Sequence, residues 1–267
     1  MQVRKMNGTV VPYDPSKLER SLKNSGADYE TIQKIMLRAN KILYNGITTK
    51  ELFRFVFTEL KKYSRPTASR YNLRNAMLEL GPEGYFFERF VARILEKQGY
   101  SVQVGKIVPG KYIEHEIDVV ASKGNEKLMV ECKHHMYPGL YCDIQTALYV
   151  YARFLEVKDK FDSAMLATNT KFSDQVLKYA EGVGLKLMGW KIPSGDSIES
   201  NIERFKLYPI TVLNSIDKKD KGVLLKQGII FVSDLSKNKK LDRMLGISNK
   251  KAEEIIEEAR TLQIEHQ

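Results

Sequence analysis

The longest regular pattern of apolar and polar positions lies in the middle of the chain. In residues 84–98, the apolar side chains Phe87, Val91 and Ile94 recur at helical spacing and predict an amphipathic helix. Further runs follow: strands at 100–108, 113–121 and 127–133, a helix at 143–157, a strand at 163–169, a helix at 174–183 and a strand at 185–190. This αβββαβαβ order predicts an α/β fold with a mixed sheet flanked by helices.

The pattern before this core is mostly helical. Residues 1–12 alternate around Asn7-Gly8 and predict a short two-stranded ribbon. Helical spacing follows, and either Thr48 or Thr49 is expected to cap the third of these helices. The predicted helices begin near Asp14 and then span 29–43, 48–63 and 67–80. The first segment is therefore expected to be a small ribbon over a helical bundle.

The last segment has short helical patterns and no clear strand, so we expect a small all-α module. The patterns lie at 221–229, 232–235 and 249–263. Turn-forming residues at 81–84 and 192–195 separate the three segments. The expected domains are residues 1–80, 81–195 and 196–267.

Two predicted strands carry charges inside apolar runs. Glu131 and Lys133 are two residues apart, so their side chains project from the same face of a strand, roughly 7 Å apart. A hairpin turned at 122–125 can bring Asp118 beside Glu131. Paired carboxylates in a partly buried site repel each other, which is tolerated if a divalent cation lies between them or if one is protonated. A lysine beside them can offset negative charge that develops on a phosphate.

The acid Glu88 lies at the edge of the apolar stripe on the preceding helix, beside Leu95, and can reach the sheet. The spacing D-x(12)-E-x-K also arises by chance in a chain with 28% charged residues. Placement inside apolar runs favours a site, because buried charges without a function are rare.

Residues 84–193 resemble the Mrr-like branch of the restriction-endonuclease-like nucleases, the PD-(D/E)xK superfamily. The resemblance rests on the sequences GYFFERF, EIDVV, VECK, DIQTALYVYARF and AMLATNTKFSDQVLKYAEGVGLKLMGW. The resemblance implies a restriction-endonuclease-like αβββαβ core that hydrolyses phosphodiester bonds with one or two metal ions. The implied roles are Asp118 and Glu131 as metal-binding acids, Lys133 as catalytic lysine, Glu88 as a helix-borne acid that assists metal binding, Gln145 as the added glutamine, and Thr168 and Thr170 facing the site.

Three histidines flank the charged strands. His115 precedes Asp118, and His134 and His135 directly follow Lys133. Adjacent residues of a strand point to opposite faces, so at most one of His134 and His135 faces the site. We expect contact with substrate or with the metal ligands, in preference to metal ligation.

The sequences VRKMNGTVVPYDPSKL, GITTKEL and ASRYNLRNAMLELGP resemble an ATP-cone, a nucleotide-sensing domain, over nearly all of residues 1–80. The resemblance implies that ATP or dATP is held by Val3, Lys5, Lys17 and Thr49. Met6 stands where an arginine is usual, and Phe53 where some members have a polar residue or histidine, so phosphate or base contacts are altered. The alternative is a basic fold that grips DNA or mediates assembly.

The sequences LLKQGIIFVSDL and LDRMLGISNKKAEEII resemble a helix-hairpin-helix. Such hairpins present backbone N–H groups to DNA phosphates. Gly246-Ile247-Ser248 replaces the usual Gly-x-Gly, and the second glycine is what permits close approach. A protein-contact role is an equal alternative.

Composition and charge limit the classes of protein to which this chain can belong. The 267 residues include two cysteines, too few for a disulfide framework, and a polar N-terminus unlike a signal peptide, so a soluble cytoplasmic protein without a membrane partner is expected. Net charge is +10, and residues 1–80 alone hold 15 Lys and Arg against 7 Asp and Glu. This basic excess favours a polyanionic partner, either nucleotide or nucleic acid.

Together these features predict a metal-dependent DNA endonuclease that uses Mg²⁺ or Mn²⁺ and is modulated by ATP or dATP. The alternative is a nucleotide-responsive DNA-binding regulator or assembly factor whose nuclease core does not cleave. An RNA-directed nuclease is a weaker reading, because the strands carry no aromatic stacking pattern. A homodimer is expected because double-strand cutting generally needs two active sites.

Overall fold

The computed structural model describes residues 1–235 and 240–264. The chain forms two compact units, and one of them is discontinuous in sequence. The first unit combines Met1–Met77 with Tyr208–Gln267, and the second comprises Leu78–Leu207. The short helix α9 (Ile198–Phe205) thus belongs to the central unit, whereas the pattern of turn residues had assigned it to the third segment.

The central unit is built on a five-stranded mixed sheet with strand order β10-β8-β6-β5-β4. Strands β4, β5 and β6 are antiparallel, while β6, β8 and β10 are parallel. The elements are α6 (Tyr85–Lys97), β4 (Ser101–Pro109), β5 (Glu114–Lys123), β6 (Glu126–Lys133), α7 (Ile144–Glu156), β8 (Ser163–Thr168), α8 (Asp174–Val183) and β10 (Lys186–Met188). The predicted α/β class and αβββαβαβ order are confirmed.

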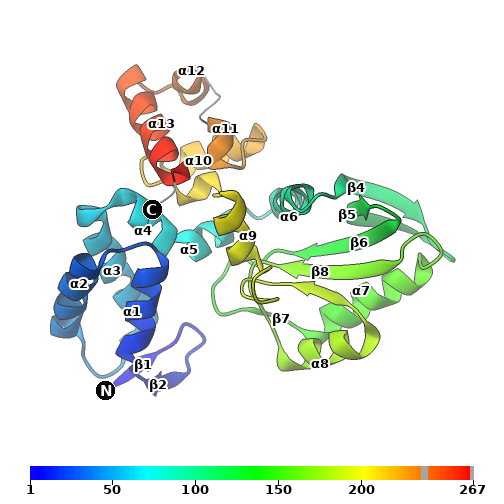
Figure 1. The fold of residues 1–267 in the computed structure, drawn as a ribbon, viewed down its shortest axis with the longest axis horizontal. Coiled ribbons are helices and arrows are strands. Elements are labelled where there is room, and N and C mark those ends of the chain that lie inside the picture. The colour runs from blue at the N-terminus through cyan, green and yellow to red at the C-terminus, as the bar shows by residue number, and fades with distance from the viewer. Residues whose placement is uncertain (236–239, 265–267) are drawn as a thin grey trace. The chain divides into compact units, whose positions relative to one another are not determined.

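Helices cover both faces of this sheet: α7 and α8 lie on one face and α6 on the other (Figure 1). Ala147, Val150 and Phe154 of α7 are buried in one core with Val120 and Met129 of the sheet. Full burial of a Val, Phe or Met side chain contributes about 1.5–3 kcal/mol. The helical spacing of these residues thus explains why α7 docks on the strands that carry the charged residues.

A second, two-stranded sheet in this unit escaped the sequence patterns. Strand β7 (Tyr141–Cys142) pairs in parallel with β9 (Lys171–Phe172). Each strand is only two residues long, which is too short for apolar alternation to be seen. Directly after these strands, Asp143 caps α7 and Ser173 caps α8.

In the discontinuous unit, the N-terminal part has the predicted ribbon over helices. Strand β1 (Gln2–Arg4) pairs antiparallel with β2 (Val10–Pro12) and parallel with the short β3 (Ile47–Thr48). The helices are α1 (Pro15–Asn24), α2 (Tyr29–Ile42), α3 (Thr49–Tyr63), α4 (Arg65–Tyr71) and α5 (Leu73–Leu78). Thr48, and not Thr49, caps α3 through a capping box with Glu51. The predicted helix at 67–80 breaks at Asn72, whose side chain accepts a hydrogen bond from Asn75.

The C-terminal part of this unit is all-α, as predicted. Its helices are α10 (Lys218–Lys226), α11 (Val232–Leu235), α12 (Leu241–Leu245) and α13 (Asn249–Gln263). Glu258 of α13 is buried and accepts hydrogen bonds from the backbone N–H groups of Asn214 and Ser215, both at 2.8 Å, and from the hydroxyl of Ser69 in α4 at 3.3 Å. This carboxylate therefore ties the C-terminal helices to the N-terminal helices.

In the described residues 1–235 and 240–264, none of the helices combines the length and the apolar character that a membrane span requires.

Candidate active site

At Asp118 the pairing of strand β5 with β4 is interrupted, and its pairing with β6 has ended. The register with β4 runs through the pairs Val104–Val119 and Lys106–Ile117 and leaves out Gly105, which lies opposite Asp118 with a φ of 64°. A glycine adopts this left-handed conformation without steric penalty and bends the strand. The register with β6 ends at Val119–Val130. The sheet thus opens around the Asp118 side chain.

The opening brings the two predicted acids together. Glu131 is the residue after Val130, so it lies across from Asp118 where the strands diverge. The backbone N–H of Cys132 donates to Asp118 Oδ2 at 2.7 Å, which fixes the aspartate carboxylate against β6. The pairing predicted from the hairpin is therefore present in the fold.

The cation at these acids is Arg153, which the sequence patterns did not single out. Arg153 Nη1 donates to Glu131 Oε2 at 2.6 Å, and Nη2 donates to the backbone carbonyl of Glu116. The arginine is 9% exposed and comes from the C-terminal half of α7. A charged residue on the buried side of an apolar helix was the available signal, and Gly105 inside a strand was the signal for the bend.

The acids at the opening hold their protons more tightly than usual. Burial, followed by the charge of Asp118, raises the pKa of Glu131 to about 7, although Arg153 opposes this shift. Burial also raises the pKa of Asp118, against the Cys132 hydrogen bond and the Arg153 charge. Glu88, in the first turn of α6, has its pKa raised to about 7 by burial and then by the charges of Asp118 and Glu116. One arginine does not compensate this concentration of negative charge.

A divalent cation fits the two strand acids. Across the described parts of the chain, no three His, Cys, Asp or Glu side chains form a group that could hold a metal ion. Mg²⁺ is commonly bound through one or two carboxylates plus water and substrate phosphate. Asp118 and Glu131 suit that pattern, whereas Glu88 is coupled to them by charge, and its assistance in metal binding stays a prediction.

Lys133 and Gln145 are exposed and make no hydrogen bond or ion pair to Asp118 or Glu131 within the described ranges. Lys133 is at the end of β6, next to Thr168 of β8, whose hydroxyl donates to the Lys133 carbonyl at 2.7 Å. Its charge adds to the lowering of the pKa of His135, after burial, and of the pKa of Asp143, after the hydrogen bonds of Thr146. Gln145 lies in the first turn of α7. Their catalytic roles therefore stay predictions.

The adjacent histidines contact different elements. The His134 ring packs against that of Phe87 in α6 in a tilted arrangement, with ring centroids 5.5 Å apart. His135 Nδ1 lies 2.9 Å from the hydroxyl of Thr170, and its backbone is bracketed by Asn169, which accepts from His135 N and donates to His135 O, both at 2.8 Å. Burial lowers the pKa of His135. His115 is also buried, with Nε2 3.8 Å from Glu156 Oε2.

The residues predicted to hold a nucleotide lie on the ribbon and on two helix starts. Val3 is buried in β1, and Lys5 is exposed in the turn after it. Lys17 is exposed in α1 and lies 3.6 Å from Asp14, while Thr49 is the first residue of α3.

Phe53 accounts for one departure from the ATP-cone pattern. Its ring stacks on Tyr71 at 5.1 Å and on Phe57 at 5.9 Å between centroids. This residue therefore contributes aromatic packing between α3 and α4, where a polar residue would leave a gap.

Each of the three segments of the chain matches a different protein-family model. The family model described as ATP cone domain matches residues 1–75, that described as Restriction endonuclease matches 81–191, and that described as AF1548-like, C-terminal matches 208–263. The predicted fusion of an ATP-cone, an Mrr-like nuclease domain and a C-terminal module is confirmed. The helix-hairpin-helix character of that module stays a prediction.

Two matches to similar proteins extend over nearly the whole length of those proteins. An uncharacterized protein of Archaeoglobus fulgidus is 44% identical over 172 residues, which cover 64% of this chain and 98% of that protein. The crystal structure of AF1548, a protein of unknown function, is 42% identical, covers 68% of this chain and 98% of that chain, and has a TM-score of 0.59. With this identity and coverage, the chain belongs to the AF1548-like family and carries an ATP cone domain and a restriction endonuclease domain.

Proposed function

We propose that this protein is a metal-dependent DNA endonuclease that hydrolyses phosphodiester bonds. The observation that carries the proposal is the opening of the sheet at Asp118, where two partly buried acids face one another with raised pKa values. Buried acids with perturbed pKa values are typical of catalytic and metal sites. The match of residues 81–191 to a restriction endonuclease model supports nuclease chemistry.

Asp118 and Glu131 are the residues that would hold Mg²⁺ or Mn²⁺. When bound, such an ion polarises a phosphoryl oxygen and generates a nucleophile from water. Arg153 and the Cys132 N–H orient the two carboxylates. In this proposal Lys133, exposed at the end of the same strand, would donate to the phosphate and offset its developing negative charge.

We further propose that ATP or dATP modulates this activity through the N-terminal part, with Val3, Lys5, Lys17 and Thr49 as the contact residues. The match of residues 1–75 to the ATP cone model supports this. Cleavage in the presence and absence of each nucleotide tests it, and identical rates together with no nucleotide binding by calorimetry would refute it.

The test of the nuclease assignment is cleavage of supercoiled plasmid by the full chain with Mg²⁺ or Mn²⁺. Lys133→Ala is expected to stop nicking and cutting while the circular dichroism spectrum is unchanged. Lys127→Ala is the matched control on the same strand, because Lys127 lies over the Phe161 ring at the other end of β6. Cutting by Lys133→Ala at the rate of the control would discard the role of Lys133.

One observation favours a second candidate, a DNA-binding regulator with a non-cleaving core. Lys133 is not hydrogen-bonded or ion-paired to the two acids in the described structure, and its charge acts on His135 and Asp143. Binding of duplex DNA without turnover, across both metals and several DNA forms, would select this candidate. The ratio of linear to nicked product would report whether two copies of the chain act together. Cleavage of a labelled RNA tests the hypothesis of an RNA-directed nuclease.

A further inference from the structure

Arg153 orients Glu131, but the proposed hydrolysis does not explain why a buried arginine does so. Its guanidinium is buried and reaches the site from α7, with Nη1 on Glu131 Oε2 and Nη2 on the Glu116 carbonyl. Its Nε is buried and has no hydrogen-bond partner in the described structure. A buried arginine held in this way is weak evidence for stability, because an apolar side chain of similar size packs at least as well.

The arginine limits the oxygen atoms that can bind a cation. Glu131 Oε2 is occupied by Arg153 at 2.6 Å, and Asp118 Oδ2 is occupied by the Cys132 N–H at 2.7 Å. Among the described residues, Asp118 Oδ1 and Glu131 Oε1 have no hydrogen bond. An oxygen that accepts one hydrogen bond keeps a second lone pair, but a cation at Glu131 Oε2 would lie beside the Arg153 guanidinium. The two oxygens without a hydrogen bond, one from each acid, are the set that a single ion uses when it binds two carboxylates.

The position of the guanidinium disfavours a second ion. Arg153 Nη1 lies 2.6 Å from Glu131 Oε2, so a second divalent cation on that side of the carboxylate would lie beside a buried positive charge. Repulsion between two cations is only weakly screened away from water.

We infer that Arg153 occupies the place of a second metal ion, so that the site of each chain binds one divalent cation and not two. This inference rests on the proposed function, because it specifies the metal content of the same site. Arg153 acts through Glu131 and is therefore a positioning residue.

The test is the number of Mn²⁺ ions bound by the full chain without DNA, measured by calorimetry and by the electron paramagnetic resonance signal of free Mn²⁺. The wild-type chain is expected to bind one ion at this site, and Glu131→Gln to lose it. Two ions lost together in Glu131→Gln, or no ion bound by the wild-type chain, would overturn the inference.

Variants of the arginine separate charge from packing. Arg153→Met removes the charge and frees Glu131 Oε2, so a second Mn²⁺ is expected to bind, a gain that misfolding cannot produce. Arg153→Lys keeps the charge and is expected to keep one ion. Arg93→Met, on an exposed arginine of α6 that pairs with Glu96 at 3.4 Å, is the control and should also keep one ion.

If Arg153→Met is folded by circular dichroism and still binds one ion with unchanged affinity, the inference fails. If that variant does not fold, the wild-type and Arg153→Lys counts decide the question. Plasmid cleavage is scored separately. One bound ion without cleavage refutes the nuclease proposal and leaves the inference standing, whereas cleavage with two bound ions does the reverse.

Discussion

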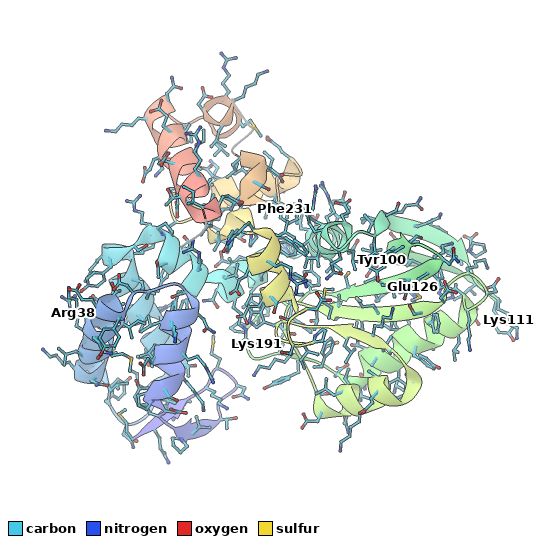
Figure 2. All side chains as sticks on the ribbon, viewed as in Figure 1. Arg38, Tyr100, Lys111, Glu126, Lys191 and Phe231 are labelled. Carbon is cyan, nitrogen blue, oxygen red and sulfur yellow. The ribbon has the colours of Figure 1, made fainter. Side chains whose placement is uncertain are left out.

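Glu59 is buried and Glu131 is partly buried, and each contacts an arginine, yet their surroundings shift their pKa values in opposite directions. Glu59, in α3, is bonded to Lys62 and to Arg38, which is labelled in Figure 2. The hydrogen bond from Lys62 and then that from Arg38 lower the pKa of Glu59 in spite of burial. Glu131 also has its arginine, but burial and the neighbouring Asp118 raise its pKa to about 7.

The difference lies first in burial, which is the largest cause of the raised pKa of Glu131, and then in the ratio of cations to acids. Arg38 and Lys62, whose side chains are half-exposed, both pair with the single carboxylate of Glu59. At the other site, one buried arginine serves Glu131 while Asp118 and Glu88 add further negative charge. A site whose acids outnumber its cations is stabilised by a bound cation, whereas a site whose cations match or outnumber its acids is a structural ion pair. Counting charges around a buried acid thus separates a ligand site from a structural contact.

The largest effect expected from this comparison is on cleavage. Glu131→Gln removes a carboxylate oxygen that would hold the metal ion, and we expect the cleavage rate to fall about a thousandfold or more, because metal ions supply several kcal/mol of transition-state stabilisation. Glu59→Gln should cut plasmid normally and lose about 1–3 kcal/mol of stability, since it leaves two cations without their partner. Equal loss of cleavage in both variants would contradict the distinction between a metal-binding acid and an acid of a structural ion pair.

The next effect is the pH dependence of stability without metal. An acid whose pKa is raised on folding keeps its proton while the unfolded chain ionises, so stability is highest below the usual value of about 4.5 and falls as pH rises towards about 7. For Glu131 alone, the shift to about 7 corresponds to about 3 kcal/mol at most. Urea unfolding followed by Trp190, the one tryptophan of the chain, reports on the central unit.

Two controls sharpen this measurement. Glu131→Gln should show a shallower fall between pH 5 and 7.5, while Glu59→Gln should match the wild-type curve because Glu59 lies in the other unit. Mg²⁺ should stabilise the wild-type chain more at pH 7.5 than at pH 5, since binding requires deprotonated carboxylates. Stability that rises with pH in the absence of metal would contradict the raised pKa of Glu131.

The smallest effect is expected at Lys62, the more exposed partner of Glu59. The Lys62 side chain is 57% exposed, so Lys62→Met should cost less than about 1 kcal/mol. Because the hydrogen bond from Lys62 is the first cause of the lowered pKa of Glu59, that pKa should rise towards its usual value, which carboxyl NMR resonances can follow. An unchanged Glu59 pKa would mean that Arg38 alone sets it.

Much of the site could be predicted because each of its acids lies in a distinct local pattern. Asp118 and Glu131 stood out as charges inside apolar strands, and the structure places them across from one another. The break at Asn72 and the short strand β7 were not predicted, since two-residue pairings and side-chain bonds leave no periodic trace.

The sequence by itself determined the order of helices and strands, their faces and the presence of two acids on neighbouring strands, because periodicity and hairpin turns act over a few residues. Only the tertiary structure decided which cation meets those acids. Lys133 is two residues from Glu131 along the same strand, but Arg153 reaches it by the packing of α7 across the sheet. Burial then excludes water from that contact, and this sets the charge balance of the site.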